Sequence, residues 1–219
     1  MLGNLRNLFE RVVIGNSTPS LLKWGKAVPQ PLVLELQADA FRQLVRYAAK
    51  HQKFFAAKLK EYGLNPSTIR KPEDLGELFT TPEDLVGRPA EDFLCRPPQL
   101  VFETTGTSGP PKRVYFTYDE LARSARYQAA GLWENGIRPG DRVVCAFDAG
   151  FWVSSWVTFF ACERLGVFCS AAGKPYPREL YARMGVYHYN VIIADPTWLV
   201  SLTEIAEREG VFPVKLIVA

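Results

Sequence analysis

The chain has 219 residues, of which 47% are hydrophobic and 22% charged, a composition that is typical of a globular protein and excludes a disordered one. This length suffices for one large domain or two small ones, each with a real core. A net charge of +3, without a dense block of lysine or arginine, argues against nucleic acid as a partner.

Residues 1–98 are predicted to form a helical and irregular N-terminal region. The first 34 residues show no clean period, but from Phe41 apolar residues recur at helical spacing as far as Ala49. A second short helix is expected to hold Phe54, Phe55, Leu59 and Tyr62, with Gly63 at its C-terminal cap. In the stretch FTTPEDLVG, Thr81 is expected to cap a helix that has Pro82 in its first turn.

Residues 99–219 alternate between strand and helix patterns. Continuous runs of valine and isoleucine separated by helices indicate a parallel sheet that is covered on both faces. We therefore predict an α/β fold, with a helical N-terminal segment followed by a mainly parallel sheet flanked by helices. The expected strands are 100–103, 113–116, 141–147, 166–171, 191–194 and 214–218, and the expected helices are 117–133, 151–165, 177–184 and one beginning at 195–196. The helix at 151–165 is apolar almost all round, so we expect it to be deeply buried.

The loop between the first two expected strands has an unusual sequence, TTGTSGPPK, over residues 104–112. Gly106 and Gly109 allow the backbone to turn and to approach a ligand closely. Hydroxyl groups from the threonines and the serine, backbone N–H groups and the ammonium of Lys112 together suit a polyphosphate. The alternative is a glycine- and proline-rich surface hairpin without a ligand, because these residue types also populate ordinary turns.

Two familiar nucleotide loops are excluded by spacing. The sequence GxxxxGK[ST] needs four residues between its glycines, whereas Gly106 and Gly109 are separated by two, and no serine or threonine follows Lys112. The dinucleotide fingerprint GxGxxG is also absent from this loop. The loop therefore holds phosphates, if it holds them at all, as a hairpin between two strands.

At this point the sequence resembles a known family. Residues 104–112 match every fixed position of [ST]-[ST]-G-[ST]-[ST]-G-x-P-K, the signature of the adenylate-forming superfamily that contains the acyl-CoA synthetases. Arg113 replaces the glycine that usually follows the lysine, as is common in the phenylacetate–CoA ligase-like branch. The order of NGIRPGDRVVCAF, CERLGVFCSAAG and NVIIADPTWLVSL also resembles that branch, over about residues 35–219.

The resemblance implies an ATP-dependent carboxylate-activating ligase. With Mg²⁺ present, a carboxylic acid attacks the α-phosphate of ATP, and coenzyme A then displaces AMP from the acyl-adenylate. Carried over from the family, the residues that hold the leaving pyrophosphate would be Thr104, Thr105, Gly106, Thr107, Ser108, Gly109 and Lys112. An aromatic acid would be bound by Phe147, Phe151 and Trp152, although aromatic residues are more often simply part of a core.

Several family features have no counterpart in this chain. The sequence ends in an expected core strand, and the glutamate that supports Mg²⁺, the ribose-binding aspartate and the adenylation lysine are all absent. We therefore expect the N-terminal piece of a longer enzyme, with its catalytic residues beyond residue 219 and no adenylation by these residues alone. Two alternatives remain open: a non-catalytic nucleotide-binding or interaction module, and an adenylating enzyme whose acceptor is not coenzyme A.

The remaining features favour structural roles and a cytoplasmic location. No apolar run approaches the roughly 20 residues that span a bilayer, and the N-terminus lacks the apolar core of a signal peptide. Four cysteines without a CxxC pair are expected to be buried thiols, and neither a disulfide nor a metal site is expected. His51 and His188 are predicted to be structural rather than catalytic.

Overall fold

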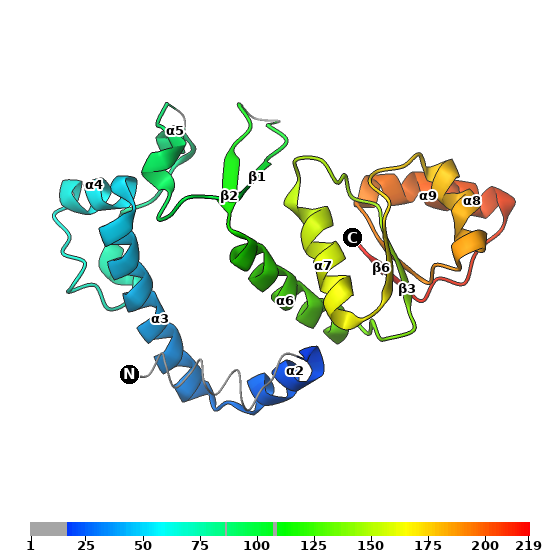
Figure 1. Ribbon diagram of the computed structural model, residues 1–219, viewed down its shortest axis with the longest axis horizontal. Helices are drawn as coiled ribbons and strands as arrows, with labels where there is room; N and C mark the ends of the chain where they lie inside the picture. The colour runs from blue at the N-terminus through cyan, green and yellow to red at the C-terminus, as the bar shows by residue number, and fades with distance from the viewer. Residues whose placement is uncertain (1–16, 86, 107–108) are drawn as a thin grey trace. The chain divides into compact units, whose positions relative to one another are not determined.

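The computed structural model describes residues 17–85, 87–106 and 109–219, which form two compact units (Figure 1). The first unit comprises the described residues up to Gly25, the short segment Phe102–Thr104, and Tyr118–Ala219. The second comprises Lys26–Val101 and Thr105–Thr117. Helix α2, Thr18–Ala27, lies almost entirely in the first unit.

The first unit is built on a parallel sheet in the order β4-β3-β5-β6. Its strands are β3 (Arg142–Cys145), β4 (Phe168–Ala171), β5 (Val191–Ile193) and β6 (Leu216–Val218), and all three pairings are parallel. The helices are α6 (Tyr118–Glu134), α7 (Val153–Leu165), α8 (Pro177–Tyr187) and α9 (Pro196–Glu209). The predicted α/β fold with a parallel sheet is confirmed.

Helices cover both faces of this sheet because successive strand residues point in opposite directions. Val143, Val191 and Ile193 pack with residues of α6 and α7 in one core cluster. Val144 and Ile192 pack with residues of α8 and α9 in a second cluster (Figure 1). Strands that are buried on both faces read as continuous apolar runs, which is why the sequence predicted them well.

The second unit contains the helices α3 (Gln30–His51), α4 (Lys53–Glu61) and α5 (Pro82–Leu85) and the short 3₁₀ helices η2 (Pro72–Leu75) and η3 (Ala90–Phe93). Its small core gathers Val45, Leu59, Ile69 and Leu78. The side chain of Gln52 donates to the carbonyl of Phe93 at 2.7 Å, which ties the α3–α4 junction to η3. The predicted cap of α5 is confirmed, since the Asp84 N–H donates to Thr81 Oγ1 at 3.4 Å.

One helix is longer than its apolar pattern indicated, and one expectation about a helix was wrong. Helix α3 begins at Gln30 rather than near Phe41, because its first turns expose Leu32 and Leu34 and therefore carry no one-sided apolar stripe. Helix α7 is not buried all round, since Trp156 is 42% exposed. The buried side of α7 instead carries small residues, including Ser155, whose Oγ lies 4.0 Å from Cys145 Sγ.

None of the four cysteines forms a disulfide, and only two of them are fully buried. Cys145 and Cys162 lie in the core, whereas Cys95 and Cys169 are half-buried. Burial raises the pKa of the Cys145 thiol, so this side chain stays protonated and behaves as a small apolar residue.

Candidate functional site

The predicted phosphate loop joins β1 (Leu100–Glu103) to β2 (Arg113–Phe116), and the two strands form a two-stranded sheet, as expected from the sequence. The N–H of Gln99 donates to the carbonyl of Phe116 at 2.9 Å and so joins the two ends of this hairpin. The two strands therefore carry the loop as the connection of a short hairpin.

Gly106 is the residue that fixes the shape of the loop. Its φ of +67° lies in the left-handed region, and a Cβ at this position would lie 2.9 Å from the carbonyl oxygen of Gly109. The N–H of Gly109 donates back to the carbonyl of Gly106 at 3.3 Å, which closes the turn. Thr107 and Ser108, which sequence analysis also placed in the site, lie outside the described residues.

The other predicted phosphate ligands lie on the surface. Thr104, Thr105, Gly109 and Lys112 are exposed, and Gly106 is half-buried. The charge of Lys112 also acts on Glu83 of α5. Hydrogen bonds from the Glu83 backbone N–H and the Thr81 side chain lower the pKa of Glu83, and the positive charge of Lys112 lowers it further. The loop therefore presents a cation and several donor groups to a ligand that approaches from solvent.

The predicted acid-binding residues follow β3. Phe147 is half-buried and packs against the core beneath α7, whereas Phe151 is 65% exposed. Trp152 is half-buried and occupies the N-cap of α7. The N–H of Glu103 donates to the carbonyl of Phe151 at 2.8 Å, so this segment lies beside the end of β1, one residue before Thr104. This hydrogen bond lies within the first unit and fixes the segment that carries Phe151 against Glu103.

Sequence analysis missed an ion pair at the carboxyl ends of the strands. Lys174 Nζ, after β4, lies 2.8 Å from Asp195 Oδ2, after β5. Asp195 also accepts hydrogen bonds from Thr197 Oγ1 at 2.6 Å and from the Trp198 N–H at 2.9 Å. The ammonium of Lys174 and these donors lower the pKa of Asp195 to about 2. The Asp-Pro pair predicted the helix start, but no sequence signal linked Asp195 to a lysine in another loop.

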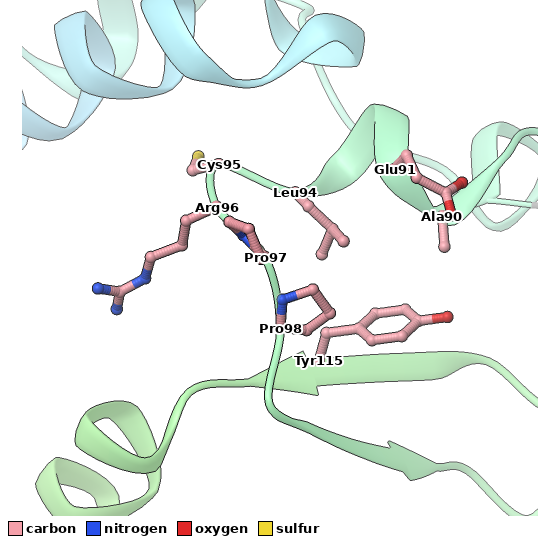
Figure 2. A pocket seen from close by; sticks show the side chains of 8 residues that line it. All are labelled: Ala90, Glu91, Leu94, Cys95, Arg96, Pro97, Pro98 and Tyr115. Atoms are coloured by element: carbon pink, nitrogen blue, oxygen red, sulfur yellow. The ribbon is translucent and has the colours of Figure 1, made fainter.

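A second feature without a sequence signal is a cavity of about 430 Å³ in the second unit (Figure 2). The side chains of Leu94 and Pro98 point toward the same space as that of Tyr115, which belongs to β2. The side chain of Arg96 points away from it. The guanidinium of Arg96 donates to Thr117 Oγ1 at 3.2 Å, directly after β2. The cavity is mainly apolar, and its lining residues come from two segments that are far apart in the sequence.

Neither histidine lies in the phosphate loop. The ring of His51 lies 4.6 Å from that of Tyr47 at the end of α3, and His188 ends α8 with a φ of 53°. Within 17–85, 87–106 and 109–219, no three side chains from histidine, cysteine, aspartate and glutamate are grouped so that they could hold a metal ion. Over the same ranges, no helix is both long enough and apolar enough to cross a membrane.

The chain is similar to ligases that act with coenzyme A. It is 25% identical over 195 residues to a phenylacetate–coenzyme A ligase from Thermus thermophilus, covering 87% of this chain and 44% of the ligase. A second phenylacetate–coenzyme A ligase, from Pseudomonas putida, is 22% identical over 181 residues, or 81% of this chain and 41% of the ligase. No protein-family model matches the chain.

The structural comparison agrees with the sequence comparison. A crystal structure of 2-hydroxyisobutyryl-CoA ligase with 2-HIB-AMP and CoA, in the thioesterification state, matches with a TM-score of 0.77 and 25% identity. The match covers 87% of this chain and 43% of that ligase. The chain thus spans less than half the length of the relatives it matches.

Together these comparisons confirm the resemblance that the loop suggested. The chain is a homologue of part of the phenylacetate–CoA ligases, in the adenylate-forming superfamily, and it has the α/β fold of those CoA ligases.

Proposed function

We propose that this chain provides the pyrophosphate-binding hairpin of an ATP-dependent, AMP-forming acid–CoA ligase. The observation that carries the proposal is the loop at 104–112, which combines the complete signature sequence with an exposed hairpin whose turn depends on Gly106. An ordinary surface turn needs glycine at such a position but does not need hydroxyl groups on both sides of it and a lysine after it.

The chemistry of adenylation explains why such a loop is needed. The acid's carboxylate attacks the α-phosphorus of ATP, the bond to the bridging oxygen breaks, and pyrophosphate leaves with the electron pair. Negative charge therefore accumulates on the β- and γ-phosphates. The N–H groups of the loop, its hydroxyls and the ammonium of Lys112 stabilise that charge, and more strongly as it develops. This is how Thr104, Thr105, Gly106, Gly109 and Lys112 would act.

The proposed reaction also involves coenzyme A, Mg²⁺ and a carboxylic acid. In the proposed reaction the thiol of coenzyme A displaces AMP from the acyl-adenylate, but we assign no residue of this chain to that step. The residues at the loop do not suit Mg²⁺, since hydroxyls and an ammonium group are not the carboxylate set that this ion prefers. We propose that the acid is aromatic and lies against Phe147, Phe151 and Trp152. Free cysteines are consistent with a cytoplasmic enzyme.

The proposal predicts which ligands this chain binds. Titration calorimetry should show binding of ATP and of pyrophosphate but not of AMP, because the loop is expected to contact only the β- and γ-phosphates. Lys112→Ala removes a charge-assisted contact worth about 1.5–3 kcal/mol, so both affinities should fall at least about tenfold. Lys53→Ala, which removes an exposed lysine on α4, is the matched control and should change neither affinity.

Two results would contradict the proposal. If AMP bound as tightly as ATP, recognition would rest on the nucleoside rather than on the terminal phosphates. If Lys112→Ala and Lys53→Ala weakened ATP equally, the lysine of the loop would contribute only general charge.

A further inference from the structure

The order of the strands in the first unit reverses at the carboxyl end of β3. The connection from β3 runs through α7 to β4 on one side, while the next two connections, through α8 and α9, lead to β5 and β6 on the other side. Core packing places α7 on one face of the sheet and α8 and α9 on the opposite face (Figure 1). In open α/β sheets, ligands bind outside the carboxyl ends of the strands at such a switch point.

The ion pair between Lys174 and Asp195 spans this switch point. Lys174 follows β4 and Asp195 follows β5, and β3 lies between those two strands. The two charged atoms are 2.8 Å apart, and the Lys174 side chain remains 42% exposed. Lys174 is also the only cation in the three segments that leave β3, β4 and β5, which are residues 146–152, 172–176 and 194–197.

Asp195 is anchored independently of Lys174. Its Oδ1 accepts from Thr197 Oγ1 and from the Trp198 N–H, so only Oδ2 faces the ammonium group. The indole N–H of Trp198 also donates to the carbonyl of Pro175 at 2.8 Å, which fixes the segment that carries Lys174. Lys174 can therefore turn its ammonium toward another anion while Asp195 keeps two hydrogen bonds and its place at the N-terminus of α9.

We propose that Lys174 is a specificity-determining residue that pairs with the carboxylate of the acid substrate at this switch point, with Asp195 as its positioning residue. This inference rests on the proposed function, because it takes the ligand to be a carboxylic acid. A free acid in water is an anion, and its approach to the exposed Asp148 and the half-buried Asp195 needs a compensating cation. Lys174 supplies that cation and exchanges Asp195 for the ligand.

The chain contains a matched ion pair at the opposite end of the same sheet. Lys215 Nζ lies 2.7 Å from Asp141 Oδ2, and the Lys215 side chain is 43% exposed. Asp141 precedes β3 and Lys215 precedes β6, so this pair lies at the amino ends of the strands, away from the switch point. Removal of Lys215 therefore reports what the loss of a comparable ion pair does to the fold alone.

The indole N–H of Trp198 provides a local probe, since its acceptor is the residue next to Lys174. In ¹H–¹⁵N spectra of the whole chain, with this signal assigned through Trp198→Phe, phenylacetate is titrated and phenylacetamide serves as the uncharged comparison. Phenylacetate should shift the signal saturably. The dissociation constant should rise at least tenfold in Lys174→Met, recover to within about threefold in Lys174→Arg, and stay unchanged in Lys215→Met. Phenylacetamide carries no charge for Lys174 to pair with. Its dissociation constant for the wild-type chain should therefore be at least as high as that of phenylacetate for Lys174→Met.

The proposal is overturned if phenylacetate leaves the Trp198 signal unmoved, or if Lys174→Met binds it as tightly as Lys215→Met does. It is also overturned if the amide binds as well as the acid. Titration with ATP separates this outcome from a failure of the proposed function. If ATP binding depends on Lys112 but acid binding does not depend on Lys174, only the proposal for Lys174 is refuted. If acid binding depends on Lys174 but ATP binding does not depend on Lys112, only the proposal for the phosphate loop is refuted.

Discussion

The exchange of Gly106 for alanine tests whether the shape of the loop matters, and Gly109 offers a matched control in the same turn. At Gly106 the added methyl group would lie 2.9 Å from the Gly109 carbonyl oxygen and 3.0 Å from the ring of Pro111. At Gly109 it would meet no atom within 4 Å. The two variants thus add the same methyl group to one constrained and one unconstrained glycine.

The expected magnitude follows from the backbone conformation. A residue with a Cβ pays about 1–2 kcal/mol in the left-handed region, and the contact with the carbonyl oxygen of Gly109 cannot be relieved without opening the turn. A loss of this size corresponds to a factor of about 5–30. Gly106→Ala should therefore weaken ATP binding by that factor. Because the strain is local to the loop, urea denaturation should show a loss of unfolding free energy no larger than about 2 kcal/mol.

Titration calorimetry with ATP and urea denaturation followed by circular dichroism are the two assays. Gly109→Ala should unfold within about 0.5 kcal/mol of the wild-type chain, and its ATP affinity should fall less than that of Gly106→Ala. The reasoning is refuted if Gly106→Ala keeps the wild-type affinity. It is equally refuted if the two variants lose affinity to the same extent, because the loss would then not come from the turn.

Three further predictions concern the first unit. Asp195, with a folded pKa of about 2 against an ordinary value of 3.8, contributes stability that is present above about pH 4 and is lost as the pH falls toward 2. In Asp195→Asn, urea denaturation across that window should therefore show an unfolding free energy that depends less on pH. An unchanged pH dependence would contradict the low pKa of Asp195. Asp141 is buried and accepts hydrogen bonds from Lys215 Nζ, Asn190 Nδ2 and the Arg138 N–H. Asp141→Asn should therefore lower the unfolding free energy by about 1.5–3 kcal/mol. An unchanged unfolding free energy would show that water replaces these donors. Ile137→Ala, at a fully buried position, should cost about 2–5 kcal/mol, while Val186→Ala, at an exposed one, should change the melting temperature little; equal effects would place Ile137 outside the core.

The sequence predicted the strands better than it predicted the helices. Strands β1 and β2 have the predicted bounds, and the central strands were found within a few residues, because burial on both faces leaves uninterrupted apolar runs such as 191–193. The first turns of α3 were missed for the opposite reason. Leu32 and Leu34 are exposed there, so the apolar residues do not mark one face.

The candidate site was predicted only in part, for a similar physical reason. A contiguous loop such as 104–112 carries its chemistry in adjacent residues, and so it can be read from the sequence. The pairing of Lys174 with Asp195 depends on the order β4-β3-β5, which brings together the ends of two strands that are not neighbours. Nothing in the spacing of those two residues encodes that order. The approach of Phe151 to Glu103 likewise depends on a tertiary hydrogen bond.

The most direct test of the phosphate loop is the ³¹P spectrum of ATP in the presence of the chain. If residues 104–112 hold the leaving pyrophosphate, the β- and γ-phosphate signals should shift and broaden on addition of the wild-type chain, with a smaller effect on the α-phosphate. The effect should disappear with Lys112→Ala and persist with Lys53→Ala. Signals that shift mainly at the α-phosphate, or that respond equally to the wild-type chain and Lys112→Ala, would contradict the assignment of this loop.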